Sequence, residues 1–99
     1  MSILNKSSKY KICKDIVYRR ENSKDNLIIL RNKNGGPLLL LDLTGSLILE
    51  LCDGKNTTQD IINHIFNKFS DTNIETVEKD VKDFLIMLQE KNIIEEIKL

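Results

Sequence analysis

The hydrophobic period of the sequence changes near Leu43, and no other feature constrains the fold as strongly. Before this point, short apolar runs typical of strands alternate with polar segments. After it, apolar residues recur every three or four positions, as they do along one face of a helix. Strands followed by helices predict an α+β fold. Because 99 residues have room for one hydrophobic core, residues 1–99 are expected to form a single domain, with residues 1–9 as a flexible segment.

The first half of the chain predicts three antiparallel strands. The first is Ile12–Arg20, and the second, Asn26–Arg31, follows the polar turn Glu21–Asp25. A further turn, Asn34–Pro37, has the glycines that a hairpin loop needs to reach positive φ. The leucine run Leu38–Leu41 then forms the third strand.

The second half predicts three helices, of which the first is short. Thr44 is expected to cap this first helix, and Gly54 lies where a glycine often ends one. Its apolar residues are Leu47, Ile48 and Leu51.

Capping patterns mark the starts of the second and third helices. Thr57 with Asp60 resembles a capping box, and Thr72 with Glu75 repeats the pattern. The third helix carries a stripe within an arc of about 100°, made of Ile74, Val77, Val81, Phe84, Leu85 and Leu88. The whole plan is that of a winged helix-turn-helix with its three-stranded sheet moved to the N-terminus.

The end of the chain has its own apolar residues. Lys91 and Asn92 are expected to end the third helix, and Ile93, Ile94 and Ile97 to form a short strand or a packed extension.

The run Leu38–Leu41 is the first feature that a core does not fully explain. One face of such a sheet packs on the helices and the other meets water, so alternate leucines are expected in solvent. If the strand lies at an edge, its backbone groups are poorly protected, because the run itself carries no charge and Pro37 protects only its beginning. An extended peptide could dock there as an added strand. The residues equally allow the tail Ile93–Ile97, or a second copy of the chain, to cover this edge.

Composition limits the classes of partner. Hydrophobic residues make up 40% and charged residues 30% of the chain, which excludes a disordered chain of low hydrophobicity. Fifteen basic and fifteen acidic side chains cancel, so the net charge gives no field that favours nucleic acid. Met1–Lys9 has no apolar signal region, and no apolar run approaches the roughly 20 residues that span a membrane. A cytoplasmic protein without a membrane partner is expected.

No residue pattern indicates an enzyme or a cofactor. Cys13 and Cys52 are too far apart for a C-x-x-C site and are expected to be buried or half-buried. The single histidine, His64, cannot build a metal site and is expected to be partly exposed on a helix. Asp53 and Asp60 could form a carboxylate pair, but turn and capping roles account for both.

Two segments together resemble a known family. Residues 41–61 read L-x-x-T-G-x-x-I-L-x-L-C-D-G-x-x-T-x-x-D-I. The downstream matches are Val77, Asp80, Val81, Phe84, Leu85, Leu88, Asn92, Ile93 and Ile94. In these positions the chain resembles the PqqD-like family, over roughly Ile12 to Ile94. Asn92 departs from the glycine that the family often has there, although asparagine also tolerates the left-handed conformation.

The resemblance implies a non-catalytic recognition element for ribosomally made precursor peptides. The leader of the precursor would pair with the third strand and lie in the cleft between that strand and the third helix. The residues implied for leader binding are Leu38, Leu39, Leu40, Leu41, Val77, Asp80, Val81, Phe84, Leu85 and Leu88. Val81 and Leu88 are expected to serve mainly the core, whereas Phe84 and Val77, nearer the start or margin of the stripe, are the better candidates for contact with the leader.

The resemblance also implies a modifying enzyme as partner, which could be a radical S-adenosylmethionine enzyme, a cyclase or a leader peptidase. Under this hypothesis Thr44 caps a helix, Gly45 permits close packing, and Asp53 with Gly54 closes a turn.

Two other functions remain open from the residues alone. A winged helix could read DNA with its third helix through Lys79 and Lys82, but acidic neighbours such as Glu78 and Asp83 oppose this. A structural subunit that forms a homodimer through its open edge is the other.

Overall fold

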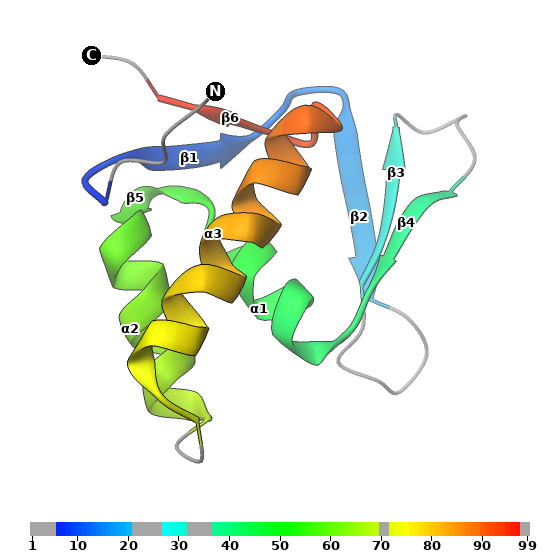
Figure 1. The fold of residues 1–99 in the computed structure, drawn as a ribbon. Coiled ribbons are helices and arrows are strands. Elements are labelled where there is room, and N and C mark those ends of the chain that lie inside the picture. Colours follow the sequence, from blue (N-terminus) through cyan, green and yellow to red (C-terminus); the bar gives the residue numbers. More distant parts are fainter. Residues whose placement is uncertain (1–5, 21–26, 32–36, 70–71, 98–99) are drawn as a thin grey trace.

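The structure is a computed structural model that describes residues 6–20, 27–31, 37–69 and 72–97. The turn expected at Glu21–Asp25 lies outside these residues, as does most of the turn expected at Asn34–Pro37. Within these residues, three helices and two antiparallel sheets pack around one hydrophobic core (Figure 1). The predicted α+β fold of the winged helix-turn-helix type is confirmed.

One sheet contains the three predicted strands, in the order β2-β3-β4. These strands are β2 (Ile16–Arg20), β3 (Leu27–Arg31) and β4 (Pro37–Leu41), and both pairings are antiparallel. The first strand is shorter than expected because the chain turns before it, where the Ile16 amide donates to the Cys13 carbonyl at 3.0 Å. The predicted strand Ile12–Arg20 is therefore two strands.

A second sheet, in the order β5-β1-β6, was not expected from the sequence. It consists of β1 (Lys9–Ile12), β5 (Asp53–Thr57) and β6 (Ile94–Glu96), all antiparallel. The expected strand in the tail is confirmed as β6, which pairs with β1 at the C-terminal end of α3 (Figure 1). Backbone bonds also hold residues 6–9, since the Lys6 and Ser8 carbonyls accept from α2 amides, which differs from the flexible segment expected there.

Helix α1 (Leu43–Glu50) begins two residues earlier than a Thr44 cap would allow. Asp42 is the N-cap, and its Oδ1 accepts from the Gly45 amide at 2.8 Å. Asp42 is the N-cap because the chain is still extended at this residue, with a ψ of −174°, and becomes helical directly afterwards. Gly54 does not end this helix; it lies in β5 with a φ of +83°, which favours glycine.

Helix α2 (Thr58–Lys68) starts with the capping box expected from the sequence. The Asp60 amide donates to Thr57 Oγ1 at 3.1 Å, and the Thr57 amide donates to Asp60 Oδ2 at 2.9 Å. The bond from the Thr57 amide, followed by the nearby Thr57 side chain, lowers the pKa of the Asp60 carboxyl, because both stabilise its charged form.

Helix α3 (Ile74–Glu90) is capped by Asn73, whose Oδ1 accepts from the Thr76 amide at 2.8 Å. The predicted cap at Thr72 is therefore one residue too early, since the chain is still extended at Asn73. The predicted end is confirmed, because Asn92 has a φ of 59° and redirects the chain into β6.

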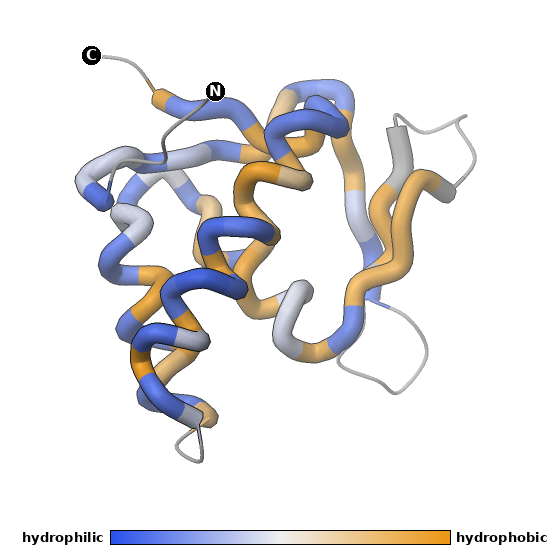
Figure 2. The backbone as a smooth tube through the Cα atoms, viewed as in Figure 1, coloured by the Kyte–Doolittle hydropathy of each residue, from blue (hydrophilic) through white to orange (hydrophobic). Residues whose placement is uncertain are grey.

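The core draws residues from all three helices and from both sheets. Tyr10, Ile29, Leu49, Ile61 and Leu85 are each at most 1% exposed. Figure 2 shows hydrophobic residues along β4, and alternating with hydrophilic ones along α3. As expected, Cys52 is buried and Cys13 half-buried, and His64 lies exposed on α2.

Candidate functional site

Strand β4 lies at the edge of its sheet, with β3 as its neighbour in the described part of the chain. Its leucines alternate as expected: Leu38 and Leu40 are 43% and 57% exposed, whereas Leu41 is 3% exposed and Leu39 packs against the core. The described part of the tail pairs with β1, so the alternative in which Ile93–Ile97 cover the edge of β4 is wrong.

The opposite edge of the same sheet is protected by charge. Strand β2 ends in Arg19 and Arg20, both exposed, and the Arg20 guanidinium pairs with the Glu50 carboxylate at 2.9 Å. Charged side chains are a common way to keep an edge strand from pairing with another chain. Strand β4 has no charged residue, so β4 is the better of the two edges for strand addition.

The residues that the sequence singled out on α3 fall into two groups. Val77, Val81, Leu85 and Leu88 are at most 4% exposed and form part of the core. This placement holds for Val77 too, despite its expected position at the margin of the stripe. The second group is accessible: Asp80 is exposed and Phe84 is half-buried.

Phe84 lies against the start of α1. A Cβ atom added at Gly45 would stand 2.9 Å from Phe84 Cζ, closer than such atoms approach in proteins. The absence of a side chain at Gly45 therefore lets α1 and α3 come together, as the sequence predicted for this glycine.

A small hollow opens between α1, the end of α2 and the first half of α3. Its volume is about 180 Å³, and its lining is mainly apolar with one carboxylate, that of Asp80. The residues that line it are Thr44, Ile48, Ile65, Phe69, Thr72, Val77, Asp80 and Val81. The structure thus brings together three of the predicted residues on α3, next to the helix that follows β4.

Five of these lining residues were not predicted as part of the site: Thr44, Ile48, Ile65, Phe69 and Thr72. In the sequence these five residues look like the apolar face or the start of a helix, and residues that only form a core look the same. The position of the hollow depends on where α1 and α2 end, which hydrophobic periodicity does not predict.

The outward face of α3 has its basic residues paired. Lys79 Nζ lies 3.0 Å from Asp83 Oδ2, and Lys82 Nζ lies 3.1 Å from Glu78 Oε2. Lys6 adds a further contact to Glu78 at 3.2 Å. Hydrogen bonds from Lys82 and Lys6 lower the pKa of Glu78. The hydrogen bond to the Asp83 carboxylate raises the pKa of Lys79. A helix face neutralised in this way does not attract a phosphate backbone.

Comparison with known families decides what kind of protein this is. The family model described as coenzyme PQQ synthesis protein D (PqqD) matches residues 28–94. The chain belongs to the PqqD family. A search of curated proteins found no similar sequence.

A solved structure shares the fold of this PqqD-family chain. It is that of TbiB1 in complex with the TbiA(beta) leader peptide, with a TM-score of 0.73 and 28% sequence identity. The similarity covers 86% of this chain and 94% of that chain. The similarity therefore extends over most of both chains.

The Asp-Gly pair of the PqqD signature has a structural role here. Asp53 Oδ1 accepts from the Lys55 amide at 2.8 Å and from the Asn56 amide at 3.0 Å, which closes the turn expected from the sequence. These bonds also lower the pKa of the Asp53 carboxyl. Neither Asp53 nor Gly54 needs a ligand to explain its place.

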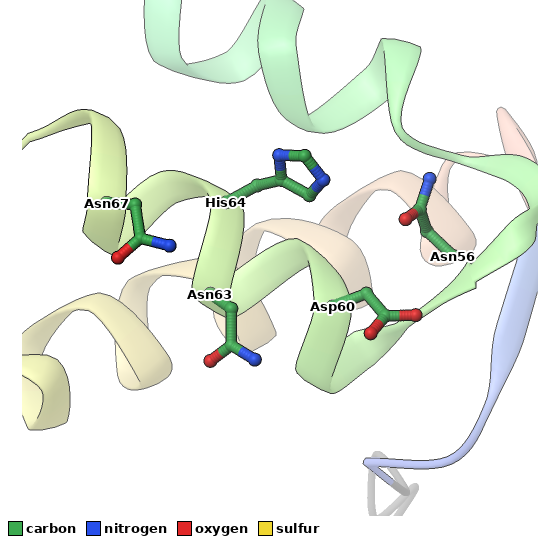
Figure 3. A pocket seen from close by; sticks show the side chains of 5 residues that line it. All are labelled: Asn56, Asp60, Asn63, His64 and Asn67. Carbon is green, nitrogen blue, oxygen red and sulfur yellow. The ribbon is translucent and has the colours of Figure 1, made fainter.

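A second hollow in this PqqD-family chain, of about 370 Å³, is polar (Figure 3). It is lined by Asn56, Asp60, Asn63, His64 and Asn67. Several of these groups already bond to near neighbours: Asp60 to Thr57, Asn56 to Asp53 at 3.1 Å, and Asn63 to Gln59 at 3.0 Å. Turn and helix structure account for these contacts.

The environment of Cys52 does not favour nucleophilic chemistry. Burial raises the pKa of the Cys52 thiol to about 12, so it stays protonated and is a poor nucleophile. Within the described residues, no cluster of three or more His, Cys, Asp or Glu side chains could hold a metal ion. None of the helices in that part of the chain is long and apolar enough to cross a membrane.

Proposed function

We propose that this chain is a non-catalytic recognition element that binds the leader of a ribosomally made precursor peptide as a strand added to β4. The observation that carries the proposal is the edge of β4, which is uncharged and exposes Leu38 and Leu40, in a PqqD-family fold. The similar protein TbiB1 is known in complex with a leader peptide, which supports the same role here.

Strand addition assigns different tasks to backbone and side chains. The backbone groups of β4 that point away from β3 would pair with any extended peptide, and this pairing gives affinity without sequence selection. Selection would come from the side chains beside the added strand. On the helix side we assign this task to Leu39 and to the accessible α3 residues Asp80 and Phe84.

The buried members of the predicted set would act indirectly. Leu41, Leu85 and Leu88 are at most 3% exposed, so they support the surface that the leader meets. Val77 and Val81, also buried, line the floor of the hollow of about 180 Å³. An apolar leader side chain could enter this hollow beside the carboxylate of Asp80.

The chain would supply proximity and leave the chemistry to a partner enzyme. Binding the leader raises the local concentration of the attached core peptide, into the millimolar range for a short flexible tether. The partner would be a radical S-adenosylmethionine enzyme, a cyclase or a leader peptidase.

Dimerisation competes for the same edge, since a second copy could pair with β4 in place of a leader. The two occupants differ in their concentration dependence. A dimer would weaken on dilution and would be displaced by a leader that binds the same strand.

The decisive test is a titration of isotope-labelled protein with a synthetic leader peptide from the neighbouring precursor gene, followed by backbone amide shifts. We expect shifts to concentrate at Leu38–Leu41, Asp80 and Phe84. A scrambled leader of the same composition is the control. A folded protein that shows no shifts at high peptide concentration would exclude this role.

A second test addresses the mode of binding. Leader peptides with one N-methylated amide each, moved along the docking segment, lose one backbone donor at a time. An added strand directs alternate amides toward β4, so we expect the loss of affinity to recur at every second residue. Each lost bond should cost about 0.5–1.5 kcal/mol. A period of three or four residues would indicate a helical leader instead.

A further inference from the structure

The face of the β2-β3-β4 sheet that points away from the helices is apolar near β4. The register pairs Leu40 with Ile28 and Ile28 with Arg19, so these three residues share one face. Val17 and Leu38 lie two residues from Arg19 and Leu40 and so belong to the same face. We call these five residues the outer face. The opposite face packs into the core through Ile16, Ile29 and Leu41.

Among the apolar residues of the outer face, exposure is greatest at the β4 margin. Leu40 is 57% and Leu38 43% exposed, whereas Val17 on β2 is 36% exposed. Arg19 places a charge on the β2 side, and Ile28 in the middle strand is half-buried. The solvent face of an antiparallel sheet is usually polar, so two exposed leucines in one edge strand call for a partner at that edge.

A strand added to β4 would supply this partner. Residues directly opposite one another on neighbouring strands have Cβ atoms about 4.5–5.5 Å apart. Every second side chain of an added strand therefore points to the outer face and lies beside Leu38 or Leu40. The remaining side chains point toward α3.

We propose that the leader carries apolar side chains at two alternate positions that point away from α3 and pack against Leu38 and Leu40. This inference rests on the proposed function and extends it to specificity. A strand that is apolar on both faces reads as a continuous apolar run. The docking segment of the leader is therefore a short uninterrupted apolar stretch.

The test compares two matched substitutions on the outer face, Leu40→Glu at the β4 margin and Val17→Glu on β2. Binding of a fluorescent synthetic leader is followed by anisotropy. We expect Leu40→Glu to weaken binding roughly ten-fold, because the new charge would lie against apolar leader side chains. Val17→Glu is separated from the leader by strands β3 and β4 and should change Kd by less than about two-fold.

Leader peptides with one lysine substitution each give a second, complementary test. Lysine is placed in turn at each outward position of the docking segment. One such peptide should regain affinity for Leu40→Glu and lose it for the unchanged protein. Leu38→Glu is a second variant at the same margin, in case Leu40→Glu fails to give a cooperative unfolding transition.

The outcomes separate the two proposals. If the unchanged protein does not bind the leader, the proposed function fails and this inference fails with it. If it binds, and both Leu40→Glu and Leu38→Glu bind equally well, only the inference fails. If Val17→Glu weakened leader binding as much as Leu40→Glu, another protein would bind across the whole outer face, and the inference would be overturned. The inference would also be overturned if Leu40→Glu dissociated a dimer and left the affinity for the leader unchanged.

Discussion

Gly45 shows how a single missing side chain positions a residue of the candidate site. The ring of Phe84 occupies the space that a Cβ at Gly45 would need, with only 2.9 Å between them. We expect Gly45→Val to destabilise the protein by about 1–3 kcal/mol through overpacking. Urea unfolding measures this cost, and Phe84→Ala provides the second arm of a double-mutant cycle. The same cost in both backgrounds would mean that Phe84 is not what constrains Gly45.

At the residue scale, the sequence predicted caps well only where it offered a single solution. Thr57 and Asp60 satisfy each other's backbone amides, and the predicted start of α2 is confirmed. The starts of α1 and α3 each have two residues of a type that can cap a helix. The N-caps are Asp42 and Asn73, and not the predicted Thr44 and Thr72. Which residue is the N-cap depends on where the backbone becomes helical, and residue type does not encode this.

The capping box makes the stability of α2 sensitive to acid. The pKa of Asp60 is lowered in the folded state, so its contribution is present above the unfolded value of about 3.9 and is lost as pH falls through the folded pKa. We expect Asp60→Asn to be less stable than the unchanged protein at neutral pH and equally stable in acid. Urea unfolding at both pH values measures this.

The cap of α3 provides the control, because Asn73 does not titrate. Asn73→Ala should cost about 1 kcal/mol at either pH. If the deficit of Asp60→Asn persisted unchanged in acid, the carboxylate charge would not be the cause.

At the scale of elements, the second sheet could not be predicted because its strands have no period of their own. Strand β5 consists of Asp53, Gly54, Lys55, Asn56 and Thr57, which read as a turn. It is a strand because β1 pairs with it, and β1 is itself separated from β2 by an unmarked turn at residues 13–15. Such strands depend on distant backbone partners, and a local apolar pattern does not reveal them.

The leucine run gave the opposite result. Four apolar residues in succession predicted a strand that exposes half of its side chains, and Leu38 and Leu40 are exposed. On α3 the sequence did not distinguish residues that form the core from residues that a leader could contact, since Val77 and Phe84 belong to one apolar stripe. Only the packing of α1 and α2 leaves Phe84 half-buried and Val77 buried.

At the scale of the whole molecule, β1 ties the two ends of the domain together. It pairs with β5 on one side and β6 on the other, and its Tyr10 is 1% exposed in the core. This strand lies before the family match, which begins at residue 28, yet it joins the segments on either side of α2 and α3. We therefore expect it to be essential to cooperative folding.

A chain without residues 1–12 tests this expectation. It would leave β5 and β6 with unpaired edges and would remove the Tyr10 side chain from the core, so the loss should exceed the margin of about 5–15 kcal/mol by which small domains are stable. We expect no cooperative transition in urea by circular dichroism. Lys11→Ala, an exposed change in the same strand, should keep the transition. A truncated chain that still unfolded cooperatively would show that α1, α2 and α3 with the β2-β3-β4 sheet form a domain on their own, and leader binding could then be measured on that smaller unit.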